Sequence, residues 1–211
     1  MNETTSALGW RYATKRFISN KKIPSEALQK ILESARLAPS SYGLQPYHLF
    51  VIEDSGLREK LRLASWDQPQ ITECSHLVVI QARKKIDAAY IGSYIDLVSK
   101  TRDIPVDALR DFRNAMLGTV GKNPESPEIQ EWAKRQSYIA LGFLLLTAAQ
   151  LQVDACPMEG VEGPKYDDIL GTAGSEFQTV AVAALGYRSP EDETQAYKKV
   201  RLPRERFFTF R

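Results

Sequence analysis

The sequence predicts a helix-rich α+β protein built on one sheet of about four or five strands, a common sheet size. Short apolar runs typical of buried strands alternate with helical patterns, and they lie at 47–53, 76–82, 153–156 and 177–185. A stretch without a charged residue, Tyr138 to Ala149, lies inside a longer helical pattern that begins at Ser126 and ends near Gln150. Because this stretch is apolar on every side for about three turns, we expect other elements to enclose it.

The charge-free helix is too short to cross a bilayer, which needs roughly 20 apolar residues. One interpretation is that the helix only fills a core. Its flanks leave a second role open, because Gln136 lies just before it and the segment 153–160 follows it.

Helical patterns fill most of the chain between the strands. After Pro24, the residues Leu28, Ile31, Leu32 and Ala35 recur at helical spacing and predict a helix that ends before the next proline. Further helices are expected at 6–10, 55–64, from 86 onward and around 105–117.

Three connections attract attention as loops. Pro39 and Pro46 bound a segment of small and hydrogen-bonding residues, which can supply hydroxyls and free amides. Residues 66–70 form a second polar loop that contains a tryptophan. Residues 118–127, rich in glycine and proline, are a candidate lid.

Length and composition describe an ordinary globular protein. No linker rich in Pro, Gly or Ser divides the 211 residues, so we expect one domain, 1–211. Hydrophobic residues make up 43% and charged residues 26% of the chain, and the formal charge is +2. This near balance argues against an RNA-binding or membrane-docking protein.

Several chemistries lack their usual sequence signals. Cys74 and Cys156 are isolated thiols, and the N-terminus has no secretory apolar region, so a reducing, cytoplasmic compartment is expected. The two histidines and the carboxylates show no metal-site spacing, so no metal is expected. Neither GxSxG, Walker A nor GxGxxG occurs.

Basic residues near the start suggest an anion site. If the segment 11–17 is extended, Arg11, Ala13 and Lys15 share one side of it. Cations on one side repel one another unless an anion lies between them, and a phosphate suits both Arg and Lys. A solvated basic edge is the alternative.

Four motifs carry a resemblance to a known family. They are RYATKRF at 11–17, APSSYGLQP at 38–46, PMEG at 157–160 and KVRLP at 199–203. Together they make the chain resemble the FMN-dependent nitroreductases of the NAD(P)H-dependent, oxygen-insensitive type. The resemblance implies a mostly antiparallel sheet flanked by helices, and an intertwined homodimer around a long central helix with FMN at the interface.

The resemblance also implies which residues bind FMN. They are Arg11, Tyr12, Ala13, Lys15, Pro39, Ser40, Ser41, Gly43, Asp67, Gln70, Gln136, Pro157, Met158, Glu159, Gly160, Lys199 and Arg201. In this scheme the basic residues at both ends of the chain hold the phosphate, and residues 39–43 come from the second subunit. The backbone of Glu159 and Gly160 faces flavin N5, and no side chain is catalytic.

Some positions depart from the family pattern. Certain relatives have His-Ser in place of Tyr12 and Ala13, Asn in place of Gly43 and Asp67, and Lys in place of Gln70. Loss of that lysine makes flavin reduction somewhat less favourable. Phe112 is a candidate to stack on the substrate, and a core role is equally open.

The function implied is a two-step oxidoreductase. NADH or NADPH reduces FMN by hydride transfer, and a nitroaromatic, a quinone or a similar flat, electron-poor acceptor then takes two electrons. The alternatives are a non-catalytic flavin-binding redox sensor and a dehalogenase or flavin-fragmenting enzyme of the same fold. The sequence contains no Rossmann determinant that distinguishes NADH from NADPH.

Overall fold

A single antiparallel sheet forms the centre of the molecule. The computed structural model describes residues 2–211, and within them four strands pair in the order β1-β2-β4-β3. The strands are β1 (Tyr47–Ile52), β2 (His76–Arg83), β3 (Asp154–Met158) and β4 (Phe177–Gly186). Every pairing is antiparallel, which confirms the predicted α+β class and sheet type.

The nine α-helices of the described residues lie mostly on the two faces of this sheet. They are α1 (Glu3–Trp10), α2 (Ser25–Arg36), α3 (Ser55–Leu63), α4 (Gln70–Glu73), α5 (Ala88–Arg102), α6 (Arg110–Thr119), α7 (Pro127–Gln150), α8 (Gly163–Ile169) and α9 (Arg204–Phe207). Short 3-10 helices are η1 (Ser41–Gly43), η2 (Val106–Leu109) and η3 (Glu193–Ala196). Of the α-helices, α4, α8 and α9 had no clear sequence signal, because four to seven residues show too little helical periodicity.

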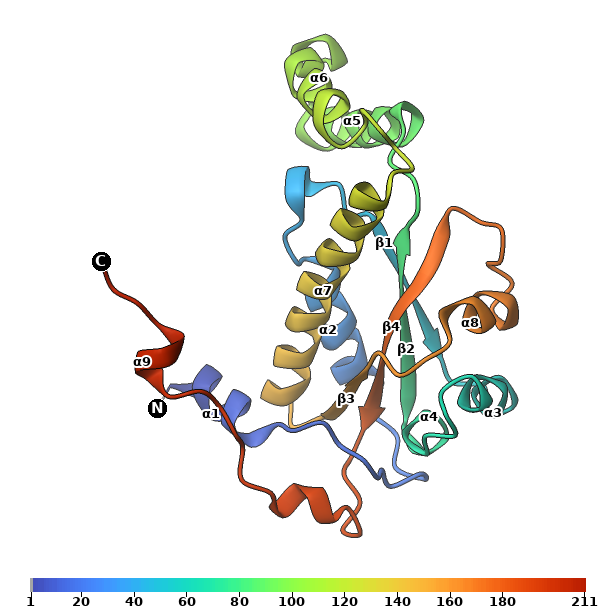
Figure 1. Cartoon of the computed structure of the whole chain (residues 1–211), viewed down its shortest axis with the longest axis vertical. Helices are drawn as coiled ribbons and strands as arrows, with labels where there is room; N and C mark the ends of the chain where they lie inside the picture. Colours follow the sequence, from blue (N-terminus) through green and yellow to red (C-terminus); the bar gives the residue numbers. More distant parts are fainter. Residues whose placement is uncertain (1) are drawn as a thin grey trace.

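Alternation along β2 divides the core into two layers. Val78 and Ile80 point to the layer that contains α2 and α7. Leu77 and Val79 point to the layer that contains α3, α4 and α8. Figure 1 shows these two groups of helices on opposite sides of the sheet. Because β2 is covered on both faces, its residues are apolar in an almost continuous run.

The helix α7 is the long central helix that the sequence predicts. Its N-cap is Ser126, whose side chain accepts a hydrogen bond from the Ile129 N–H, and Pro127 occupies the first turn. With 24 residues it is about 36 Å long. Within one chain this helix is not covered on every side, since Tyr138, Ile139 and Phe143 stay exposed along one stripe.

Helices α5 and α6 project beyond the sheet (Figure 1) and pack in a core cluster of their own. Phe112 packs against this cluster, with its ring 6.2 Å from that of Tyr42, so its contacts within the chain are core contacts. The segment 118–127, which was expected to be a lid, is hydrogen-bonded to the chain just before α5, where the Ile86 N–H donates to the Pro124 carbonyl at 2.9 Å.

The last segment leaves the body of the molecule. Residues 195–211 are exposed throughout, and both termini lie to one side of the sheet in Figure 1. Among the described residues, no helix combines the length and the apolar character that a bilayer crossing requires.

Candidate functional site

Opposite ends of the chain meet at a cavity of about 380 Å³. The end of α1 and the segment that follows η3 build its walls, which are lined by Gly9, Trp10, Arg11, Tyr12, Ala13, Thr194, Gln195, Tyr197, Lys198, Lys199 and Arg201. The Lys199 ammonium donates to the Leu8 carbonyl at 2.8 Å and also to the Arg11 carbonyl. The structure therefore brings together the early and late cations that the sequence predicted to share a ligand.

The charges in this cavity are not balanced. Within residues 2–211, no carboxylate forms an ion pair with Arg11, Lys199 or Arg201. Burial lowers the pKa of the Arg11 guanidinium, and the nearby Arg201 charge lowers it further. Burial and the same two arginines, Arg11 and Arg201, lower the pKa of Lys199. The Arg11 Nε is buried and has no hydrogen-bond partner in the described part of the chain. These features favour an anion site over a solvated basic edge.

A buried ion pair fastens this end of the chain to the sheet. Arg188 pairs with Asp154 of β3 at 2.6 Å, and its guanidinium lies over the rings of Trp10 and Tyr12 at 4.2 and 4.7 Å. Ala13 forms an isolated parallel bridge with Ala155. The loop that carries the first cations is therefore held against the end of β3.

The segment after β3 offers free backbone donors. In the structure of residues 2–211, the N–H groups of Glu159 and Gly160 have no acceptor, while the Glu159 carbonyl accepts from the Val161 N–H at 2.7 Å. The Glu159 carboxylate accepts from the Tyr138 hydroxyl at 2.6 Å. The side chain is thus occupied, and the two main-chain N–H groups are free to bind a ligand.

The polar loop between α3 and α4 holds the same segment from the other side. The Gln68 amide donates to the Gly160 carbonyl at 3.0 Å. The Trp66 ring packs directly on Gly160, where an added Cβ would lie 2.9 Å from the ring, so this position requires glycine. Sequence reasoning missed Gln68 and Tyr138, because neither belongs to the matched motifs and both act only through contacts distant in sequence.

Gln70 and Asp67, predicted together, lie in different environments. Gln70 is buried, and its Oε1 has no donor within the described residues. Burial raises the pKa of the neighbouring Cys156 thiol. The charge of Lys15, a hydrogen bond from Gln70 and the charge of Arg11 each lower that pKa, so these three side chains lie near the same sulfur. Asp67 instead pairs with Arg62 at 2.7 Å, and its side chain is 73% exposed. The structure joins Gln70, but not the Asp67 carboxylate, to the buried cluster.

An apolar cavity of about 510 Å³ separates α7 from the end of β3. It is lined by Tyr138, Leu141, Gly142, Leu145, Pro157, Met158, Glu159 and Ala181. Its size falls within the range of small-molecule sites. It brings Pro157, Met158 and Glu159 to a surface that can receive a flat apolar ring.

The remaining predicted residues lie towards the other end of α7. The Gln136 side chain accepts from the Ser41 N–H at 2.9 Å and donates to the Trp132 carbonyl at 2.9 Å. Residues Pro39, Ser40 and Gly43 belong to this loop and line a separate cavity. Gly43 has a φ of +74°, and a Cβ added there would collide with the Tyr94 hydroxyl, so this position requires glycine in this chain.

Two groups of predicted residues are therefore far apart in one chain. Gln136 lies fourteen residues before the end of α7, which corresponds to about 21 Å along the helix. In Figure 1 the loop that contains η1 lies near the start of α7, and the cationic end lies near its finish. In one chain the predicted residues therefore form two separate groups, at opposite ends of α7.

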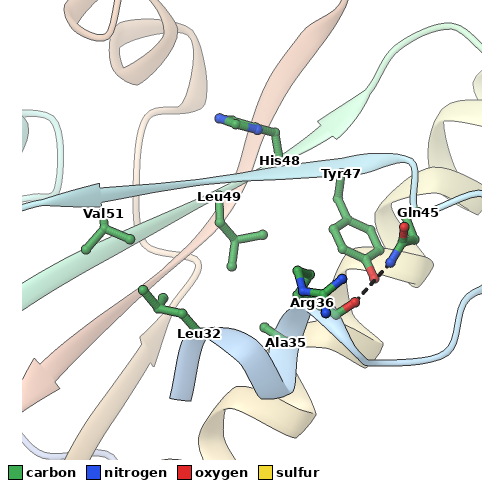
Figure 2. Close-up of a pocket in the computed structure, with 8 residues that line it drawn as sticks. All are labelled: Leu32, Ala35, Arg36, Gln45, Tyr47, His48, Leu49 and Val51. Carbon is green, nitrogen blue, oxygen red and sulfur yellow. Dashed lines mark hydrogen bonds between the residues drawn. The ribbon is translucent and has the colours of Figure 1, made fainter. Parts of the chain in front are cut away.

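A further cavity, of about 460 Å³, lies between α2 and β1 and has a different character. Figure 2 shows Leu32 of α2 facing Leu49 and Val51 of β1, and it shows the hydrogen bond from Gln45 to the Arg36 carbonyl. The Arg36 side chain pairs with Glu33. None of the predicted site residues lines this cavity, so it is distinct from the candidate site.

The fold and site define an α+β protein with one cationic cavity and one apolar cavity. Comparison with known proteins identifies its family. The model of the Nitroreductase family matches residues 8–187, so the chain belongs to the nitroreductase family and is an enzyme of the oxidoreductase class. This confirms the family predicted from the four motifs.

Relatives and solved structures agree with this assignment. A Staphylococcus haemolyticus protein named as a predicted NAD(P)H nitroreductase is 36% identical over 213 residues, covering 97% of this chain and 96% of the relative. The crystal structure of a Bacillus subtilis protein assigned as a nitroreductase has a TM-score of 0.87 at 20% identity, with 99% of each chain covered. The crystal structure of an Exiguobacterium sibiricum protein assigned as a nitroreductase, in complex with FMN, has a TM-score of 0.82 at 21% identity, covering 100% of this chain and 98% of that one.

Proposed function

We propose that the chain is an NAD(P)H-dependent FMN oxidoreductase that passes two electrons to a nitroaromatic, a quinone or a similar flat, electron-poor acceptor. The observation that carries the proposal is the convergence of Arg11, Lys199 and Arg201 on one cavity without a carboxylate partner in the described residues. A phosphate monoester carries up to two negative charges and satisfies such cations through charge-assisted hydrogen bonds. The name of the Staphylococcus haemolyticus relative and the FMN complex from Exiguobacterium sibiricum support the same cofactors.

The residues present fit FMN. The three cations suit its phosphate, and the apolar cavity beside Met158 suits its ring. Gln70 Oε1, a buried acceptor without a donor, suits an N–H group of a flavin, and the free Gly160 N–H suits a ring nitrogen that accepts a hydrogen bond. Each unsatisfied group of the site thus has a counterpart of the right kind in the cofactor.

Bound FMN supplies the redox chemistry, since flavins accept hydride from nicotinamides and pass on electrons singly or in pairs. The chain itself binds and orients. Gln68 and Trp66 fix the Gly160 backbone, so its N–H is a preorganised donor. The Tyr138 hydroxyl holds the Glu159 carboxylate through a hydrogen bond and so limits where that negative charge can move. Leu141, Leu145 and Met158 give the site an apolar wall formed by α7 and β3.

We also propose that the single domain 1–211 works as a homodimer. Gln136, which binds the loop at 39–43 through the Ser41 N–H, lies about 21 Å along α7 from its cationic end, so we expect a second copy to supply both if they contact the same ligand. The exposed stripe of Tyr138, Ile139 and Phe143 on α7 offers an apolar surface for that copy. A cytoplasmic location remains part of the proposal.

The visible absorption spectrum of the purified protein tests the function. We expect a flavin spectrum after incubation with FMN, bleached by NADH or NADPH and restored by a quinone in repeated cycles. Protein that stays colourless and oxidises neither nicotinamide in the presence of quinones would contradict the proposal. Binding of FMN without turnover would indicate a redox sensor instead.

A further inference from the structure

A buried carboxylate behind the cationic cavity connects its two walls. Asp192 is 1% exposed and is the N-cap of η3, the short helix that leads to Lys199 and Arg201. We propose that Asp192 is a positioning residue that sets the phosphate-binding cations, and that it thereby makes the site prefer FMN over the same flavin without a phosphate. This inference rests on the proposed function and extends it to a residue outside the matched motifs.

The first set of contacts reaches the N-terminal loop. One carboxylate oxygen of Asp192 accepts from the Lys15 N–H at 2.7 Å, the Arg16 N–H at 3.2 Å and the Tyr12 hydroxyl at 2.9 Å. These donors lie directly after Arg11 in the chain. The path of the loop that presents Arg11 is therefore fixed by three hydrogen bonds to one oxygen.

The second set of contacts shapes the C-terminal wall. The other oxygen of Asp192 accepts from the Thr194 N–H at 3.0 Å and from its hydroxyl at 2.5 Å. Lys199 follows five residues later and closes the cavity through its own hydrogen bond to the Leu8 carbonyl. One carboxylate thus sets both walls, which come from segments about 180 residues apart.

The Asp192 carboxylate is bound by three backbone N–H groups and two hydroxyls rather than by the cations. Burial alone raises the pKa of this carboxyl, but the hydrogen bonds from Thr194, Lys15, Tyr12 and Arg16 outweigh burial and lower the pKa, so the group is ionised at neutral pH. In the described residues, no ion pair joins Asp192 to a lysine or arginine side chain. With five donors, its oxygens are fully used. Arg11, Lys199 and Arg201 therefore keep their charge for a ligand.

Asp192→Asn tests this role, because the amide keeps the size of the side chain but replaces one acceptor oxygen with a donor NH2. We expect the dissociation constant for FMN to rise roughly 10- to 100-fold, as when hydrogen bonds to a charged group are lost. Riboflavin, which has the ring but no phosphate, should bind the variant and the wild type alike. Quenching of flavin fluorescence measures both affinities in the full-length protein.

Two further variants keep the test decisive. Asp168→Asn removes an exposed carboxylate on α8 and should leave both affinities unchanged. Tyr12→Phe removes one donor to Asp192 and should raise the dissociation constant for FMN about 3-fold. This variant replaces Asp192→Asn in the test if Asp192→Asn does not fold. An Asp192→Asn protein that binds FMN as tightly as the wild type, or that loses FMN and riboflavin equally, overturns the inference.

Failure of the proposed function has a separate signature. If the wild type binds neither flavin, the proposed function fails, and inorganic phosphate then tests Asp192. Phosphate should raise the melting temperature of the wild type more than that of Asp192→Asn if the residue positions anion-binding cations. Equal shifts, or none in either protein, overturn the inference.

Discussion

The two ends of α7 differ in how far the chain satisfies its own polar groups. At the cationic end, three positive groups have no carboxylate partner in the described structure, and Arg11 Nε and Gln70 Oε1 have no hydrogen-bond partner there. At the other end, Gln136 binds both the Ser41 N–H and the Trp132 carbonyl. Unsatisfied buried groups are costly unless a ligand completes them. We therefore expect ligand affinity to come mainly from the cationic end, with the η1 loop as a preformed wall.

The largest effect is expected from Leu145→Asp, which lies on α7 between the two ends. Leu145 packs against the core and lines the apolar cavity, so a charge there costs several kcal/mol. The dimer and the bound FMN should be lost together, because each proposed site needs the cationic end of one subunit and the η1 loop of the other. Light scattering coupled to absorbance at flavin wavelengths measures both.

Phe143→Asp provides a milder version of that change. The Phe143 side chain is 42% exposed in one chain, so the substitution should break the dimer at little cost to the fold of the subunit. Circular dichroism checks that the fold persists. A monomer of either variant that retains FMN would show that the two ends of α7 do not cooperate across subunits.

The second largest effect is expected from Arg201→Ala at the cationic end. Removal of one charged donor should weaken FMN roughly 10- to 100-fold, and the affinity of the wild type should fall as salt is added. Arg36→Ala is the matched control, since Arg36 pairs with Glu33 beside the cavity of Figure 2. Equal losses in the two variants would contradict a special role for the cationic end.

A smaller effect on affinity is expected from Gln136→Leu at the satisfied end. The substitution leaves the Ser41 N–H without its partner and should lower the free energy of unfolding by about 1–3 kcal/mol. The affinity for FMN should fall less than 10-fold, because we expect the loop to line the site and the cations to supply most of the binding free energy. Urea unfolding and flavin titration measure the two effects, with exposed Gln29→Leu on α2 as the control. A loss of affinity greater than that of Arg201→Ala would reverse the comparison.

The smallest effect on FMN affinity at neutral pH is expected from Cys74→Ala, since Cys74 lies away from both ends of α7. Burial raises the pKa of the Cys74 thiol from 9.0 to about 11. Between these values the unfolded chain loses the proton first, so stability falls as pH rises, by about 2 kcal/mol once pH 11 is reached. The variant should lack this alkaline loss and bind FMN normally at pH 7. Thermal unfolding from pH 7 to 11 compares it with the wild type, and identical slopes would contradict the expectation.

The sequence predicted the fold where its signals are local. The apolar runs gave all four strands to within about two residues, and Ser126 with Pro127 marked the start of α7. The short helix α8 was missed because seven residues with a buried Tyr166 leave no periodic pattern. The apolar composition of α7 shows that the helix needs cover, but it does not show which residues one chain leaves exposed.

The site was predicted less evenly. Motifs identified the cations and the segment 157–160, because these residue types occur in fixed patterns along the chain. Asp192 and Gln68 act through backbone atoms distant in sequence, and no pattern in one sequence reveals such contacts. Asp67 was predicted beside Gln70, yet the positive φ at Asp67 turns the chain so that its carboxylate meets Arg62.

The meeting of the first and last segments at one cavity has a consequence for the order of assembly. The sheet and its two helical layers contain no residue from the segment after 195. The body can therefore fold before the tail is in place, while the repulsion among Arg11, Lys199 and Arg201 opposes tail docking until an anion arrives. We therefore expect FMN binding to complete the docking of the tail, and the resistance of the tail to a protease would report the fraction of the protein that holds the cofactor.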